Sequence, residues 1–194
     1  MPVEMTPIAP PVGEVTICNL ALARIGATAI TALTDTTLEG VQCNLHYAAT
    51  RDALLRSHAW RFALAWVDLV EYEDGDPDPW AYEYTLPADF LRFVSTEPPP
   101  TPFEIDGQLL RTDEDSMRIH YVRQETDPDN FDPLFIEALV VSLAAKICMP
   151  LLHDKVLQQQ LADELPGAIS RARLANMQES KPQTKTTWLD AGGG

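Results

Sequence analysis

This sequence is short of cysteine, of basic residues and of any long apolar run free of charge. Its 194 residues include three cysteines, and Lys and Arg together number 14 against 29 Asp and Glu. The net charge of −15 argues against tight wrapping of nucleic acid, because binding of the phosphate backbone needs clustered Lys and Arg. The cysteines Cys18, Cys43 and Cys148 are far apart and form no Cys-x-x-Cys motif, which predicts buried, reduced thiols.

Signals for secretion and for membrane insertion are also weak. The first residues contain no basic stretch followed by a long apolar run, so no secretory signal is expected. Residues 134–152 are the best candidate for a membrane span, but Glu137, Lys146 and Pro150 interrupt the run and favour a core helix. The 45% hydrophobic content suffices for a chain of this length to bury a core. We expect a protein made in the cytoplasm, without membrane contact.

Motifs of enzyme chemistry are missing as well. The sequence has no phosphate-binding Gly-x-x-x-x-Gly-Lys loop, no His-Glu-x-x-His and no Gly-x-Ser-x-Gly. The histidines, which share no ligand spacing, are His46, His58, His120 and His153. We therefore predict no metal and no cofactor. Pairs of carboxylates could support glycoside hydrolysis, but with 29 acidic residues such pairs arise by chance. The prediction is a protein that is not an enzyme.

What the sequence does contain is a helical pattern near its start. A first apolar stripe at helical spacing consists of Val15, Cys18, Leu22 and Ile25. Gly26 follows as a C-terminal stop, and Thr36 with Glu39 forms a capping box that would begin a second helix. The face predicted to close the seam between these helices consists of Val41, Leu45, Ala48 and Leu55. The pattern predicts a helical hairpin.

The middle of the chain changes to strand-like alternation. Trp80, Tyr82 and Tyr84 would project from one face of a strand, and Asp106-Gly107 is a typical two-residue hairpin turn. Residues 117–122 supply another strand. The aromatic stripe has two readings: a stacking platform for single-stranded nucleic acid, or packing of one sheet face against the helices. No basic groove accompanies the stripe, so packing is favoured.

The last third is helical again. Pro133 suits the first turn of a helix, and the buried positions predicted to follow it are Phe135, Leu139, Leu143 and Ile147. Because this helix is apolar nearly all round, we expect it at the centre of the fold. A final long helix carries the stripe Leu157, Leu161, Leu165, Ile169 and Ala172. Pro166-Gly167 predicts a kink or break in it.

Together these patterns predict a mainly α fold of the α+β class. The expected parts are a helical hairpin, a central apolar helix, a long C-terminal helix, a small antiparallel β subdomain, and extended arms at both termini. In residue numbers, the N-terminal arm is 1–11, the main domain 12–180 and the C-terminal tail 181–194. The main domain divides into a hairpin at 12–59, a β subdomain at 60–123 and C-terminal helices at 132–180.

The C-terminal end offers the best candidates for an interface. Its basic residues are Arg171, Arg173, Lys181 and Lys185, and the apolar pair Trp188 and Leu189 follows. The basic cluster has two readings of similar weight: a solvated helix end favoured by the helix dipole, or a surface that docks on an acidic partner. Trp188 and Leu189 are predicted anchors, since exposed aromatic side chains are frequent binding hot spots.

Several of these motifs, in this order, resemble the head-to-tail adaptor proteins of tailed bacteriophages, the group that includes tail tubular protein A. The matching positions near the start are Asn19, Ala21, Leu22, Ile25, Gly26, Leu33, Asp35, Cys43, Tyr47, Arg51, Asp52, Leu54, Leu55, Arg56, Trp60, Phe62 and Ala63. Residues 80–92 and 135–145 resemble the aromatic strand and the central helix of the same group. Where related chains often have Pro before the Trp, this one has Ala59.

The resemblance implies a structural virion protein at the head–tail junction, made in the host cytoplasm. It would form a ring of about twelve subunits beneath the portal protein and receive tail or nozzle proteins below. Double-stranded DNA would pass through the lumen during ejection without specific binding. The alternative is a virion-associated hydrolase of the cell wall peptidoglycan, and a third reading is an interaction domain outside any virus.

Overall fold

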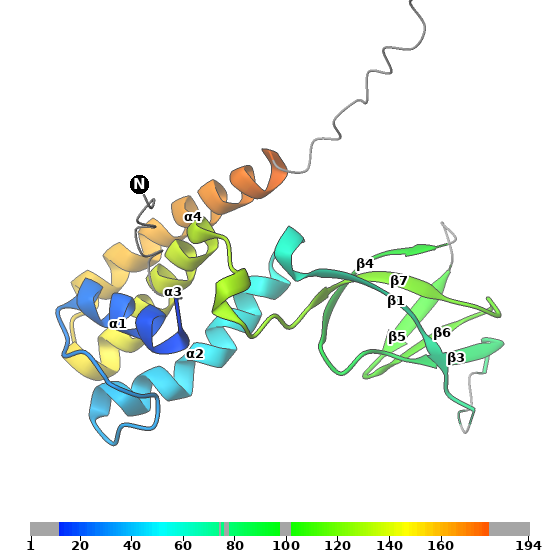
Figure 1. Ribbon diagram of the computed structural model, residues 1–194, viewed down its shortest axis with the longest axis horizontal. Helices are drawn as coiled ribbons and strands as arrows, with labels where there is room; N and C mark the ends of the chain where they lie inside the picture. The colour runs from blue at the N-terminus through cyan, green and yellow to red at the C-terminus, as the bar shows by residue number, and fades with distance from the viewer. Residues whose placement is uncertain (1–11, 74, 76–77, 98–101, 179–194) are drawn as a thin grey trace, which may run out of the picture.

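Helices and strands occupy opposite ends of the molecule (Figure 1). The computed structural model describes residues 12–73, 75, 78–97 and 102–178, and in these it contains four α-helices and seven strands. The predicted mainly helical α+β fold is confirmed. The arms 1–11 and 181–194 lie outside the described residues.

Helix α1 (Glu14–Ile25) ends as the sequence predicts. Gly26 adopts φ +72°, and its amide donates back to the last turn. A positive φ carries no steric penalty at glycine, which has no Cβ. The buried side of α1 includes Ile17, Cys18 and Leu22.

Helix α2 (Leu38–Arg56) begins one residue later than predicted. Thr37, not Thr36, is its N-cap, and the Thr37 hydroxyl accepts a hydrogen bond from the Gly40 amide at 3.2 Å. The predicted capping box is therefore wrong in register. With Thr37 as N-cap, Glu39 is the second helical residue and Gly40 the third, so the glycine occupies the position from which a glutamate reaches back in a capping box.

Helix α3 (Pro133–Leu152) is central, as predicted. Asp132 caps it, its carboxylate accepting from the amides of Leu134 and Phe135. By length and composition α3 would suffice to cross a membrane, yet half of that span is buried in the protein. Helices α1, α2 and α4 all pack against it, which is the arrangement of a core helix. Pro150 lies within the last turn of α3.

Helix α4 (Lys155–Gln178) runs unbroken through Pro166. Of the predicted kink or break at Pro166-Gly167, the break is therefore wrong. Asp154 begins this helix by accepting hydrogen bonds from the amides of Val156 and Leu157. A proline removes one backbone donor, and packing along α3 is extensive enough to keep the helix continuous across that gap.

The strands form two antiparallel sheets. The first sheet has the order β1 (Leu64–Asp68), β7 (Arg118–Arg123), β4 (Phe90–Glu97). The second has the order β2 (Val70–Glu71), β3 (Tyr82–Thr85), β6 (Leu109–Thr112), β5 (Phe103–Asp106). Between β5 and β6, Asp106 pairs with Leu109, so the turn is Gly107-Gln108, one residue after the predicted Asp-Gly. Gly107 supplies the positive φ of +61° that such a turn requires.

Two separate clusters of buried side chains hold these parts together. The larger cluster lies among the helices and reaches Val122 of β7. The smaller cluster lies between the sheets and includes Tyr84, Leu110 and Ile119. Tyr84 therefore packs against the other sheet and not against the helices as predicted. Its hydroxyl donates to the carbonyl of Glu114 at 2.8 Å.

The two ends of the molecule join around Trp60. Its indole is 1% exposed and donates a 2.9 Å hydrogen bond to the carbonyl of Leu54. The ring packs edge-on against Phe135 at 5.1 Å between centroids. A short 3-10 turn (η1, Arg61–Ala63) leads into β1, and a second (η2, Pro128–Asn130) leads from β7 toward α3. Trp60 thus fixes α2 to the central helix at the point where the chain enters the sheets.

Candidate interaction surfaces

Of the four α2 residues predicted to close the helical seam, Leu55 is buried and the other three lie in solvent. Leu38, Val41 and Leu45 are 55%, 49% and 65% exposed, and Ala48 is exposed as well. The buried side of α2 instead carries Cys43, Tyr47, Arg51, Leu54 and Leu55. The prediction was wrong because the buried stripe contains an arginine, which a pattern of apolar residues does not reveal. We call Leu38, Val41 and Leu45 the α2 apolar face.

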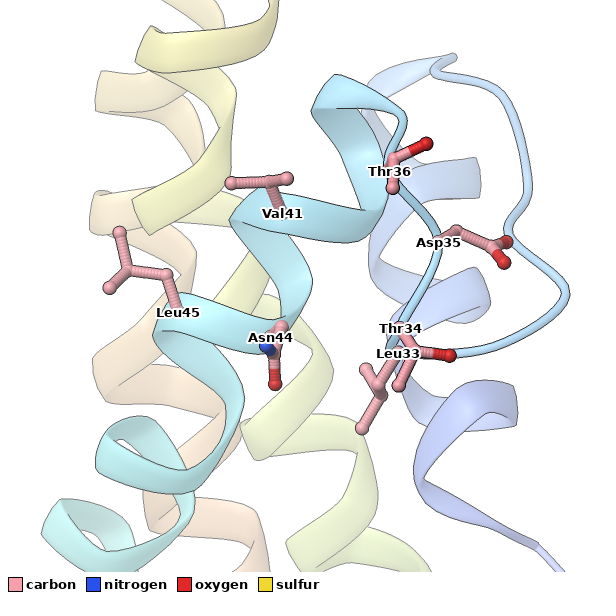
Figure 2. Close-up of a pocket in the computed structure, with 7 residues that line it drawn as sticks. All are labelled: Leu33, Thr34, Asp35, Thr36, Val41, Asn44 and Leu45. Atoms are coloured by element: carbon pink, nitrogen blue, oxygen red, sulfur yellow. The ribbon is translucent and has the colours of Figure 1, made fainter.

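A shallow hollow of about 380 Å³ borders the α2 apolar face. Figure 2 shows Val41 and Leu45 projecting from α2 while residues 33–36 run alongside the helix. The loop is held by Asp35, whose carboxylate turns away from α2 and accepts hydrogen bonds from the amides of Thr31 and Ala32. These bonds lower the pKa of Asp35.

Gly40 allows the loop to lie directly on α2. A Cβ at this position would stand 2.4 Å from the carbonyl oxygen of Asp35, closer than side-chain atoms can approach a backbone. The hollow beside Val41 therefore depends on a helical residue without a side chain.

Helix α4 also carries exposed apolar residues, near its start and near its end. Val156, Leu174 and Met177 are exposed large hydrophobic residues on it. Two of the predicted interface residues lie close by, and both are engaged within the chain. Arg171 donates to the Glu137 carboxylate of α3 at 2.7 Å, and Arg173 donates to the carbonyl of Ser57 at 3.1 Å.

The other predicted interface residues, Lys181, Lys185, Trp188 and Leu189, lie outside the described residues. The structure thus places Arg171 and Arg173 on α4. It does not test the predicted anchors Trp188 and Leu189. No feature of the sequence indicated that Arg173 would cross to the end of α2, since its partner is a backbone carbonyl 116 residues away.

Polar residues of α2 link distant parts of the fold. Arg51 is buried, binds Asp52 at 2.8 Å and approaches Glu14 of α1 at 3.7 Å. Asp52 accepts a 2.7 Å hydrogen bond from Gln124, just after β7. In the sequence Arg51 and Asp52 are part of the adaptor-like pattern, and no structural role is predicted for them.

The three cysteine thiols are buried and free, and the His120 imidazole packs against an aromatic ring. A hydrogen bond with Cys43, and then burial, raise the pKa of the Cys18 thiol, and burial raises the pKa of Cys148. His120 stacks on Trp66 at 4.5 Å. Among the described residues no group of three or more His, Cys, Asp or Glu is placed to hold a metal ion.

Comparison with models of protein families gives no match, and neither does comparison with curated proteins. The resemblance to phage adaptors therefore rests on the order and spacing of residues in this chain.

Proposed function

We propose that this protein is a head-to-tail adaptor of a tailed bacteriophage, a structural protein that forms a ring beneath the portal and joins it to the tail. The observation that carries the proposal is the placement of the motif residues. Polar positions of the adaptor pattern make specific contacts that link separate segments. Asn19 binds the backbone of Ile30, Asp35 closes the following loop, and Asp52 binds Gln124.

Trp60 belongs to the same pattern and joins α2 to α3. A chance match to an amphipathic helix would place these residues at unrelated surface positions. In this fold the residues instead lie at contacts between separate segments, which supports the view that the pattern describes one particular architecture.

The distribution of apolar and charged surface also supports this function. A ring subunit needs contacts on two sides, and the α2 apolar face and the exposed residues of α4 lie on different helices around α3. Residues 61–127 contain 16 acidic residues and 5 arginines, a net charge of −11 out of −15. In a ring, acidic residues of this region that face the channel would repel duplex phosphate from its wall and let DNA slide.

The test is mass measurement of the purified protein, alone and mixed with the portal protein encoded in the same genome. Native mass spectrometry should detect a complex in which each portal ring carries about twelve added copies. If no complex with the portal forms over the whole accessible concentration range, the adaptor function is excluded. Lysis of purified peptidoglycan by the same preparation would instead establish the hydrolase alternative.

A further inference from the structure

The arginines of this acidic chain divide into two groups. Those with a carboxylate within 4 Å are Arg24, Arg51, Arg111, Arg118, Arg123 and Arg171. Among the described residues, those without an ion pair are Arg56, Arg61, Arg92 and Arg173. With acidic residues twice as numerous as basic ones, four unpaired arginines are unexpected.

The four unpaired arginines gather at the junction between the helices and the sheets. Arg56 donates to the carbonyl of Leu91, the residue before Arg92. Arg173 donates to the carbonyl of Ser57, the residue after Arg56. The amide of Arg61 donates to Asn176, one turn along α4 from Arg173. We call Arg56, Arg61, Arg92 and Arg173 the basic junction.

In the part of the chain that the structure describes, no carboxylate offsets the charge of the basic junction. The Nε atoms of Arg92 and Arg173 are buried and have no hydrogen-bond partner among the described residues. His58 lies among these residues, and its pKa is lowered by burial, then by the charges of Arg173 and Arg92. Gathering like charges costs free energy unless an anion offsets it, so the arrangement indicates an anionic partner.

The far end of the β subdomain has the opposite charge. A hollow of about 350 Å³ there is lined by four carboxylates, those of Asp68, Glu71, Glu97 and Asp115. Arg118 contacts Asp68 and Glu97, which leaves the exposed carboxylates of Glu71 and Asp115 without an ion pair among the described residues. We call this the acidic hollow.

We propose that the basic junction binds the acidic hollow of a second copy of this chain. The two surfaces are different patches of one subunit, the junction between helices and sheets and the hollow at the far end of the sheets. The contact is therefore heterologous, the type of interface that forms a ring when its rotation closes. Duplex DNA, the other anion that these arginines could meet, is an outcome of the test below. The inference rests on the proposed ring, and it assigns the residues that join neighbouring subunits.

Charge reversal tests the contact. The variant Arg56→Glu/Arg61→Glu reverses two exposed residues of the junction, and Glu71→Arg/Asp115→Arg reverses the unpaired carboxylates of the hollow. Self-association is measured by sedimentation equilibrium at about 0.01 M salt, where the screening length is ~30 Å, and at about 1 M, where it is ~3 Å. Circular dichroism establishes that each variant is folded.

Each variant alone should associate at least about tenfold more weakly than the wild type at low salt. An equimolar mixture of the two variants should recover association, since each then offers the complement of the other. A wild type that stays monomeric at low salt, or a mixture without recovery, overturns the proposal. Binding of a duplex DNA probe that Arg56→Glu/Arg61→Glu abolishes would overturn it too, because the junction would then be a phosphate site.

Portal binding separates this inference from the proposed function. The same variants are mixed with the portal ring. If subunits of each variant still bind the portal but no longer form a closed ring on it, both proposals stand. If wild type and variants bind the portal equally in number and affinity, the adaptor function stands and the junction–hollow contact is refuted.

Discussion

Asn19 and Ile30 form a closed pair of hydrogen bonds across 11 residues. The Asn19 amide nitrogen donates to the Ile30 carbonyl at 2.9 Å, and the Ile30 amide donates to the Asn19 side-chain oxygen at 2.8 Å. One side chain of α1 thus satisfies both backbone groups of a loop residue. Asp35 binds the amide of Thr31, the next residue, so the connection between α1 and α2 is fixed from both ends.

Replacing Asn19 by Ala should therefore destabilise the protein. It leaves the donor and acceptor of Ile30 partly buried without partners, and we expect a loss of about 1–3 kcal/mol. Urea denaturation followed by circular dichroism measures it. Asn44→Ala is the matched control, because Asn44 is exposed beside the hollow. Equal effects of the two substitutions would show that the hydrogen bonds between Asn19 and Ile30 contribute nothing specific to stability.

Two glycines in helices should respond to Ala with opposite signs. Gly40→Ala should destabilise, because the new Cβ would meet the Asp35 carbonyl at 2.4 Å. Gly167→Ala in α4 meets only the end of the Arg171 side chain at 3.7 Å and should stabilise by about 0.5–1 kcal/mol through helix propensity. Thermal unfolding of the two variants gives the comparison. A stabilising Gly40→Ala would mean that the loop does not lie on α2.

Trp60→Phe tests the junction between α2 and α3. It removes the hydrogen bond to Leu54 and leaves a cavity beside Phe135, for which we expect a cost of about 2–4 kcal/mol. Trp66→Phe is the control, since Trp66 is 46% exposed and should change stability by no more than about 0.5 kcal/mol. Chemical denaturation monitored by tryptophan fluorescence distinguishes them. A small loss of unfolding free energy in Trp60→Phe would contradict the role of Trp60 in joining α2 to α3.

Acidification should destabilise the protein through two histidines. Burial lowers the pKa of His58 and of His120 below the ordinary value of 6.5, with Arg173 and Arg92 adding to the effect at His58. As pH falls below that value, the unfolded chain binds protons that the folded chain resists. The stability present above the unfolded pKa is lost as pH falls through the folded pKa.

The measurement is the free energy of unfolding between about pH 7 and about pH 5 for the wild type and for His58→Gln/His120→Gln. The double variant should show a weaker decline across this range. An unchanged slope would show that neither imidazole is held neutral by the fold.

The α2 apolar face should tolerate polar residues. Val41→Gln and Leu45→Gln should each change the unfolding free energy by no more than about 0.5 kcal/mol, because both side chains are exposed. Leu55→Ala, on the buried side of the same helix, should cost about 2–5 kcal/mol. A large loss at Leu45 would restore the original seam prediction.

The sequence was most informative where side-chain chemistry is local. The Gly26 stop, the Pro133 start and the central place of α3 all follow from short-range rules, and the structure agrees. The errors arise where tertiary packing decides. The buried side of α2 contains Arg51, whose charge is met by Asp52 and Glu14, and no apolar periodicity reveals such an arrangement.

The same reason explains what sequence reasoning missed in the candidate surfaces. The basic junction assembles from α2, η1, β4 and α4, and its members are up to 117 residues apart in the chain. Each arginine alone has the appearance of an ordinary surface residue. Only the folded arrangement shows which of them have no carboxylate partner among the residues that the structure describes.

Leu64 and Val122 are Cα partners in the pairing of β1 with β7, so the chain enters and leaves the β subdomain at adjacent points. The helical end is therefore built from two stretches that flank an insertion with closely spaced ends. Such a segment can be lengthened, shortened or exchanged during evolution while α1 to α4 keep their packing. A lineage of these proteins can thus diversify what its sheets contact and retain one helical frame.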